Sequence, residues 1–436
     1  MKHIGFASAL FLLLFLAVSN SFAKTGSQNI TLVYTGNLDG ELEPCGCSEG
    51  GDKGGIKRRA NLIDKLRKED PQLYLISSGG LLISEVAQDK IKSKYILSGM
   101  EALNYDAIGV QWKDLSYGVD VLNNAELPFI MSNNSSQDFF DKRIINNKHA
   151  RLTFFSWLDP SRNPQKDMGD AIVSNDVNAL ADNLKKAKLK NQLTILSTAL
   201  PLKLAQRKLP LNNVDILLIK AKYEEYGKPQ QIDKMLVLQP GSRGMRMGKI
   251  NLTVSTDGTL LKWEHEVIPL PEEVGDAQRM EQWYADYNEE VKVEYDKRVA
   301  LRKKLETGES SFAGEAVCKS CHASEHKKWS QSRHSEAFYA LQDVNKSFDP
   351  SCIGCHTVGF ETKGGFIDPS LTKNLMHVQC ENCHGAAKAH AKSAGVQPVS
   401  NKDWDNAKIC GQCHVQKHSP DFNFETYWPK ISHGKQ

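Results

Sequence analysis

The feature that most constrains this chain is a short pattern of cysteine and histidine that occurs four times near the carboxyl end. Each copy reads C-x-x-C-H, and eight of the ten cysteines in the 436-residue chain belong to these copies. The four motifs are Cys318-x-x-Cys321-His322, Cys352-x-x-Cys355-His356, Cys380-x-x-Cys383-His384 and Cys410-x-x-Cys413-His414. The kind of site that this repeated pattern forms therefore determines the class of protein to which the region belongs.

Three kinds of site use paired cysteines at this spacing, and the histidine distinguishes them. A zinc ribbon has no need of a histidine directly after each pair, and a thioredoxin-like dithiol occurs once, between a strand and a helix. A c-type haem needs all three residues. The two cysteines lie on one face of a helical turn and bind the vinyl groups, while the histidine binds the iron. The repeats predict four covalently attached haem c groups.

Each predicted haem has only about thirty residues of polypeptide around it, too few to bury a core without help. We therefore expect the haems to supply much of the core and to lie close together. Beyond the four motif histidines, the region after residue 311 has one methionine, Met376, and six further histidines, which are His326, His334, His377, His390, His418 and His433. The six further histidines and the single methionine favour bis-histidine ligation and low reduction potentials.

The segments between the motifs resemble a known family. "CKSCHASEHKKWSQSRHSEAFYAL", "SCIGCHTVGFETKGGF", "VQCENCHGAAKAH" and "ICGQCHVQ" are similar to the tetrahaem cytochrome c family of the hydroxylamine oxidoreductase electron acceptor. The resemblance covers about residues 312–436. It implies His334 as distal ligand of the third haem and His390 as that of the first, with His433 as a candidate for the fourth.

In the type member of that family, the second haem lacks a distal ligand from the protein. This sequence differs, because His377 stands just before the third motif. From the sequence, His377 either is the distal ligand of the second haem or has another role. We rank His326 and His418 lower, since the first lies one helical turn after a motif histidine and the second lies in a charged segment.

The first residues, "MKHIGFASALFLLLFLAVSNSFAK", have a basic start, an apolar run and small residues at Ser21 and Ala23. This pattern predicts a signal peptide over residues 1–23 that is cleaved near Ala23, and a retained anchor is the alternative. No other long apolar run occurs. We expect a mature chain that does not span the membrane and that lies in the periplasm or otherwise outside the cytoplasm.

Residues 24–271 have an α/β pattern. Short β-rich runs, among them "ITLVYTG", "LYLISSGG", "DAIGV", "PFIMSNN", "LTILST" and "VDILLI", alternate with amphipathic stretches such as "IKRRANLIDKLRKE". The charged stretch from Asp276 to Thr307 lacks Gly and Pro. It predicts one long solvated helix that serves as a spacer within a linker over residues 272–311, or alternatively a coiled-coil arm.

The blocks "LVYTGNLDGELEP", "GGIKRRANLI", "LISSGG", "LNYDAIGVQWKDLSYG", "LPFIMSNN" and "VDILLIKAKYEE" are similar, in order, to those of 5′-nucleotidase-type metallophosphatases. The resemblance implies a metallophosphatase-like α/β sandwich. The positions of the family's Asp, Asn and His metal ligands hold other residues here, which are Asn37, Asp39, Gly80, Val110 and Gln111 and, by a looser match, Thr198, Ala221 and Tyr223. With only His149 and His265 between residues 29 and 311, we expect the phosphatase chemistry to be lost.

Cys45 and Cys47 form a C-x-C pair in a Gly-rich segment. In an oxidising compartment they predict a local disulfide or a pair of thiols, and the alternative is a redox-active or metal-binding loop.

The whole sequence therefore predicts an α/β domain followed by a mainly α, haem-packed cytochrome domain over residues 312–436. The net charge of +3 gives no reason to expect nucleic-acid binding. We expect an electron carrier between redox partner proteins, such as a quinol-linked donor or a terminal reductase, with the α/β domain serving for docking or ligand binding. The alternative is an oxidoreductase that uses one open haem on a small nitrogen or sulfur compound, and an active phosphatase ranks lowest.

Overall fold

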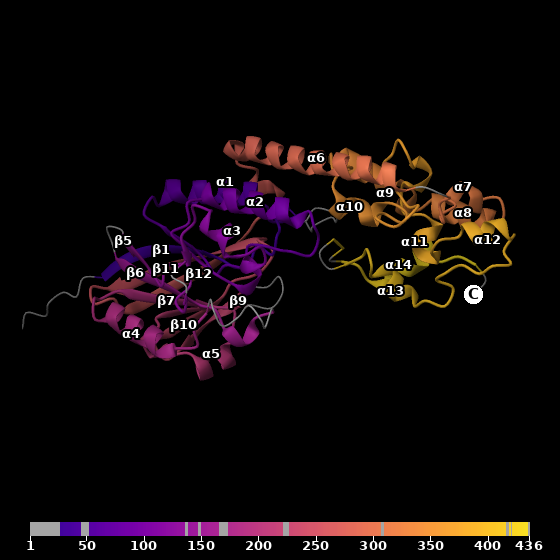
Figure 1. The fold of residues 1–436 in the computed structure, drawn as a ribbon. Coiled ribbons are helices and arrows are strands. Elements are labelled where there is room, and N and C mark those ends of the chain that lie inside the picture. The colour runs from indigo at the N-terminus through magenta and orange to yellow at the C-terminus, as the bar shows by residue number, and fades with distance from the viewer. Residues whose placement is uncertain are drawn as a thin grey trace, which may run out of the picture.

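The computed structural model describes residues 27–44, 52–135, 138–146, 150–164, 173–220, 226–306, 309–415, 418–419 and 421–434. Figure 1 shows an α/β part and a smaller helical part that carries the carboxyl end, with the long helix α6 (Glu281–Leu305) running along both. The expected fold class is thus confirmed. The predicted signal peptide, the Cys45 and Cys47 pair, His149, Ala221 and Tyr223 lie outside the described residues.

Two six-stranded sheets form the α/β part. In spatial order the first contains β12 (Leu260–Pro269), β11 (Arg246–Ser255), β1 (Ser27–Thr35), β2 (Tyr74–Ser77), β3 (Ala107–Gly109) and β4 (Phe129–Ile130). The second contains β5 (Arg143–Asn146), β6 (Arg151–Trp157), β7 (Leu193–Thr198), β8 (Ile216–Ile219), β10 (Met235–Gln239) and β9 (Gly227–Ile232). The strands that the sequence predicted are β1 to β4, β7 and β8, and these are confirmed.

Alternation along the strands explains how the sheets stack. In β1, Leu32 and Tyr34 face the second sheet, while Val33 faces the helices on the outer side. A strand with both faces buried needs apolar residues at odd and even positions alike, which is why "ITLVY" reads as a continuous apolar run. Helices cover the two outer faces and make four layers: α1 (Ile56–Glu69), α2 (Asp89–Glu101) and α3 (Val119–Asn123) on one, α4 (Val177–Lys188) and α5 (Leu202–Lys208) on the other.

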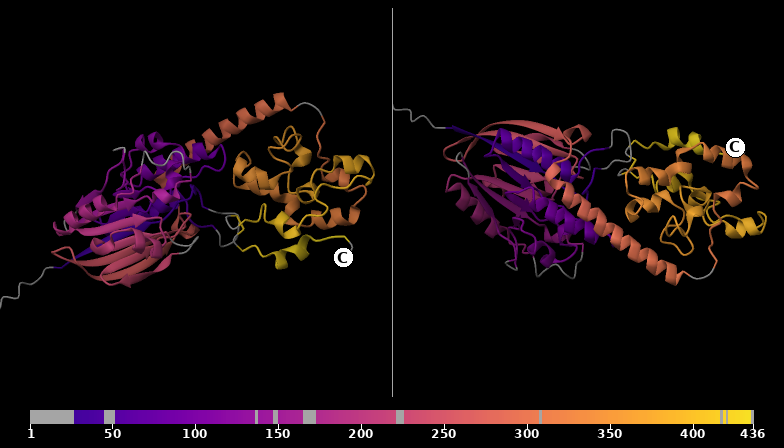
Figure 2. Two further views of the ribbon diagram at one scale, coloured as in Figure 1. Left: turned by 60° about the horizontal axis from the view of Figure 1, so that its bottom comes forward. Right: turned by 90° about the horizontal axis from the view of Figure 1, so that it is seen from above.

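Helix α6 does not have the fully solvated surface that its sequence predicted. Tyr287, Val291 and Tyr295 are buried along one side. The Trp283 indole donates to the Tyr95 carbonyl oxygen at 3.1 Å, which fixes the first half of α6 on α2. Further along, the Tyr295 hydroxyl donates to the Ile367 carbonyl oxygen at 3.0 Å. The helix therefore joins the two parts through contacts on both, as the two views of Figure 2 show.

The helical part consists of short helices linked by turns. They are α7 (Glu315–Cys318), α8 (Ala323–Ser330), α9 (Ala337–Asp343), α10 (Pro350–His356), α11 (Cys380–His384), α12 (Lys388–Lys392), α13 (Asn406–Cys410) and α14 (Phe424–Ile431). Nearly all buried apolar side chains of this part surround α10, where Phe338, Ile353 and Phe366 belong to one cluster with residues of α6. Among the described residues, no helix is both long and apolar enough to cross a membrane.

Candidate functional site

The four motifs share one local geometry. In the first, the His322 amide donates to the Cys318 carbonyl oxygen at 3.0 Å, and in the fourth the His414 amide donates to Cys410 at 2.9 Å. These bonds close one helical turn around each pair of cysteines. The second and third motifs lie within α10 and α11. A helical turn brings both thiols and the following imidazole to one region, which is the arrangement that haem attachment requires.

Three motif histidines face a second imidazole. The ring centres of His322 and His390 are 6.1 Å apart, and those of His414 and His334 are also 6.1 Å apart. The third pair, His384 and His433, has ring centres 5.9 Å apart.

These distances fit an iron between the rings. Two metal–nitrogen bonds of about 2 Å, with about 1 Å from each nitrogen to its ring centre, place the ring centres about 6 Å apart. Burial lowers the pKa of His334, His384 and His414, so their ring nitrogens stay free of the extra proton that would prevent ligation. The residues present therefore fit haem iron with two histidine ligands at three of the four motifs.

The pairing differs from the expected one in two places. His390 lies opposite the first motif histidine, as the resemblance implied, but His334 lies opposite His414 of the fourth motif rather than the third. His433 in turn lies opposite His384 of the third motif rather than the fourth. The physical reason is that each pair joins residues far apart in the chain, which sequence proximity does not reveal.

The second motif is different. His356 donates through Nδ1 to the Ala337 carbonyl oxygen at 2.5 Å, which leaves its Nε2 free to bind a metal. The His377 Nδ1 instead accepts from the Phe338 amide at 3.2 Å, and its ring lies edge-on to Tyr339. A neutral imidazole that accepts at Nδ1 carries its proton on Nε2 and has no lone pair left for iron. This arrangement does not suit His377 as a distal ligand.

Two of the remaining candidates, His326 and Met376, are held by other contacts. The His326 Nε2 pairs with the Glu315 carboxylate, as expected for a histidine that does not bind haem. Met376 is buried in the cluster around α10, and its backbone pairs with Thr357. Among the residues that the structure describes, no second imidazole faces His356 as His390 faces His322.

Thiols of different motifs lie side by side. Cys318 and Cys380 are within hydrogen-bonding reach, which raises the pKa of the first thiol and lowers that of the second. Cys355 and Cys413 form a similar pair, and their contact lowers the pKa of Cys355. The first motif therefore adjoins the third and the second adjoins the fourth, so groups attached to them would be neighbours.

In the α/β part, four of the positions matched to metal ligands come together, which are Asn37, Asp39, Gly80 and Gln111. Asn37 and Gln111 exchange amide hydrogen bonds of 3.2 and 2.9 Å, and both are buried. Gly80 lies against them at a φ of 73°, and a side chain there would start 2.5 Å from the Asn37 amide nitrogen. Two paired amides and a glycine thus fill the place where carboxylate and imidazole ligands would be needed.

Sequence reasoning missed two residues of this cluster. Lys113 forms an ion pair with Asp39, so a cation of the chain itself neutralises the carboxylate. Asp114 accepts the amides of Gly80, Leu81 and Gln111 at 2.6 to 2.9 Å. A polar residue followed three positions later by an acid is a capping signature that could have revealed Asp114. Within the described ranges, no three Asp, Glu, His or Cys side chains form a group that could hold a metal ion.

The α/β part touches the second motif directly. The Gln88 side chain donates to the Asp349 carboxylate at 3.0 Å, and the same carboxylate caps α10 by accepting the Ser351 amide. Lys346, just before this segment, pairs with Glu43 at 2.5 Å. Burial works to raise the pKa of Asp349, but the Ser351 hydroxyl and Lys346 hold it below its ordinary value. A charged, buried contact therefore fixes α10 to the α/β part.

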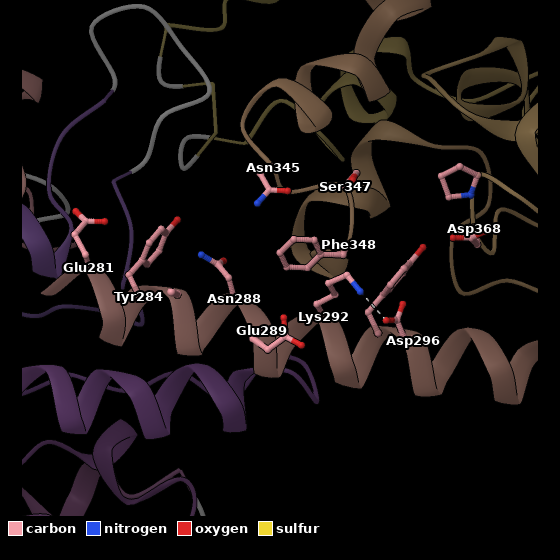
Figure 3. A pocket seen from close by; sticks show the side chains of 13 residues that line it. Glu281, Tyr284, Asn288, Glu289, Lys292, Asp296, Asn345, Ser347, Phe348 and Asp368 are labelled. Carbon is pink, nitrogen blue, oxygen red and sulfur yellow. Dashed lines mark hydrogen bonds and ion pairs between the residues drawn. The ribbon is translucent and has the colours of Figure 1, made fainter.

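A groove of about 680 Å³ lies beside this contact, between α6 and the segment before α10. Figure 3 shows Tyr284 and Asn288 of α6 pointing toward Asn345 and Phe348 across it. Its charged lining consists of Lys292 and four acids, which are Glu281, Glu289, Asp296 and Asp368. The excess of acids makes this groove unsuited to an anion.

The repeated attachment turns and facing imidazoles of the helical part are typical of multihaem c-type cytochromes, and the stacked sheets resemble the metallophosphatase fold. Residues 317–385 match the family described as cytochrome c554 and c-prime. Cytochrome c-554 of Nitrosomonas europaea is 29% identical over 136 residues, which are 27% of this chain and 55% of that protein. The chain thus spans about half the length of this curated relative. The family match covers the first three of the four motifs.

The likeness of the α/β part is one of fold. A 5′-nucleotidase precursor from Thermus thermophilus aligns with a TM-score of 0.53 at 15% identity, over 60% of this chain and 59% of that one. The sulfate thiohydrolase SoxB of the same organism aligns with a TM-score of 0.50 at 14% identity, over 59% of this chain and 60% of that one. Both resemblances that the sequence suggested are confirmed.

Proposed function

We propose that this chain is an exported electron carrier with four haem c groups, attached at the four cysteine pairs and ligated by His322, His356, His384 and His414. The observation that carries the proposal is the set of three imidazole pairs with ring centres about 6 Å apart. Distal ligation by His390, His433 and His334 follows from it. Two histidine ligands keep the potential low, which suits transfer from a quinol-linked donor toward a terminal reductase.

The haem count can be tested on the purified chain. We expect its intact mass to exceed that of the polypeptide by four haems, and a variant with both Cys410→Ser and Cys413→Ser to carry three. A wild-type chain with fewer than four haems would contradict the proposal. The same sample shows whether the amino terminus begins near residue 24, as export with cleavage near Ala23 predicts.

The second motif supports a second candidate function. Because the tautomer of His377 leaves it no lone pair for iron, the position opposite His356 is available to a small nitrogen or sulfur compound. This function predicts that reduced protein binds carbon monoxide at one haem per chain. It also predicts steady oxidation of a reduced dye in the presence of nitrite, hydroxylamine or sulfite. If the protein binds these compounds but does not reduce or oxidise them, the electron-carrier function still holds.

For the α/β part we propose a structural role at the second motif without phosphoester hydrolysis. The contacts of Gln88 with Asp349 and of Glu43 with Lys346 support a domain that holds α10 in place. Release of phosphate from a nucleotide in the presence of manganese would contradict this part of the proposal. The boundaries proposed for it, residues 24–271, with a linker over 272–311, remain to be tested by limited proteolysis.

A further inference from the structure

One peptide group lies between the two histidines near the second motif. Its carbonyl oxygen, on Ala337, accepts from the His356 Nδ1 at 2.5 Å. Its amide, on Phe338, donates to the His377 Nδ1 at 3.2 Å. The two hydrogen bonds are therefore made by opposite ends of the peptide group between Ala337 and Phe338. The two imidazoles are linked through this peptide group without touching each other.

A peptide group that donates at one end accepts more strongly at the other, because hydrogen bonds in a chain polarise one another by about 10–30% per bond. The bond to His377 thus strengthens the bond that Ala337 accepts from His356. A histidine ligand whose Nδ1 proton is held more strongly becomes a better electron donor to its metal. The chain of contacts therefore leads from His377 to the iron-binding nitrogen of His356.

The segment that carries His377 is fixed in place. His377 has a φ of 72°, in the left-handed region that residues other than glycine seldom adopt. The residue before it, Met376, forms a bridge with Thr357, and the Trp329 indole donates to the Val378 carbonyl oxygen at 2.7 Å. A backbone held in a costly conformation by its neighbours is the kind of outlier that points to a role.

The protonation state of His377 agrees with its acceptor role. Burial lowers its pKa, and the carboxylates of Glu336 and Glu315 counter this only in part. The uncharged Tyr339 ring and the Phe338 backbone amide also contact His377. At neutral pH the ring is neutral, so the Nδ1 lone pair is available to the Phe338 amide.

We propose that His377 is a positioning residue for the second haem site, which acts on His356 through the peptide group between Ala337 and Phe338 and lowers the reduction potential there. This inference rests on the proposed function, since it takes His356 as an iron ligand. It assigns His377 a role that needs no bond to iron. The second haem site would differ in this respect from the three with paired imidazoles.

Two variants of the full holoprotein test the inference. His377→Ala removes the acceptor, whereas His377→Asn keeps a side-chain oxygen near the place of Nδ1 and tolerates a positive φ. The readouts are the iron–histidine stretching band of the reduced five-coordinate haem in resonance Raman spectra and the midpoint potential of that haem. At a fixed ambient potential we expect His377→Ala to raise the reduced-to-oxidised ratio about threefold. We also expect it to lower the frequency of the stretching band, and His377→Asn to restore both values.

The inference is overturned if both variants match the wild type, or if His377→Ala converts a low-spin haem into a high-spin one. The second result would make His377 a distal ligand. If the wild type has no five-coordinate haem, the open position in the proposed function is wrong. The potentials of the two variants still decide the inference in that case, because the hydrogen bond acts on His356 whatever binds on the other side.

Discussion

The α/β part buries apolar side chains on both faces of each sheet, whereas the helical part buries them mainly around α10. The first part thus obtains its core from the polypeptide. Gly80 and Gln111 stand at positions that the resemblance matches to metal ligands, and the fold forms with these residues in place. In the second part we expect the cofactor to complete the core, so that its attachment residues would also be folding residues.

The largest effect that this comparison predicts is the loss of protease resistance in protein that lacks haem. We expect chain produced without haem attachment to lose residues 312–436 rapidly to a protease, while the α/β sandwich stays intact. The reason is that few apolar side chains are buried near the first, third and fourth motifs. Mass spectrometry of the fragments measures this. Equal resistance of both parts in the haem-free chain would break the comparison.

The next largest effect is the loss of stability caused by a single substitution in the α/β part. Asp114→Ala leaves the buried amides of Gly80, Leu81 and Gln111 without their acceptor. We expect it to lower the free energy of unfolding of this part by more than about 3 kcal/mol. Urea denaturation measures the change, and the haem absorption spectrum of the native protein is expected to stay the same.

Asp182→Ala serves as the control for that variant, because Asp182 is exposed on α4. Its effect is expected to be within about 0.5 kcal/mol. Similar stability losses for the two variants would show that Asp114 does not organise the former metal site.

A smaller effect concerns the contact between the parts. The pKa of Asp349 lies below its ordinary value in the fold, so its contribution to stability is present above about pH 4 and is lost as the pH falls further. We expect Asp349→Asn to cost about 1 to 3 kcal/mol at pH 7 and to flatten the stability profile between about pH 5 and 3. Denaturation across that range measures both, and parallel profiles for variant and wild type would contradict the account.

The smallest effect is a predicted lack of response. A metal that binds the native state at a hundred times its Kd adds about 2.7 kcal/mol of stability. Because Asn37 and Gln111 pair with each other and Lys113 pairs with Asp39, we expect manganese or a chelator to leave the Tm of the α/β part unchanged within about 1 °C. Calorimetry measures this, and a rise of several degrees would show that a metal centre survives.

The residues that attach a haem covalently lie within five consecutive positions. The Cys and His positions of all four motifs could therefore be predicted without knowledge of the fold. The buried strands could be predicted as well, because "ITLVY" and "DILLI" are almost entirely apolar. The buried side of α6 could not, since Tyr287, Val291 and Tyr295 are scattered among charged residues.

The partners of the motif histidines were only partly predictable. Which imidazole lies opposite which depends on how segments far apart in the chain cross, and this placed His334 with His414 and His433 with His384. The tautomer of His377 depends on one backbone amide from another helix. No sequence pattern encodes that contact.

The most direct test of the account is an electron paramagnetic resonance spectrum of the fully oxidised protein, with total haem quantified so that each signal can be counted per chain. Three imidazole pairs and an open position at His356 predict three low-spin haems and one high-spin haem. Four low-spin haems would show that His356 has a second protein ligand opposite it, and would contradict the account of the second motif.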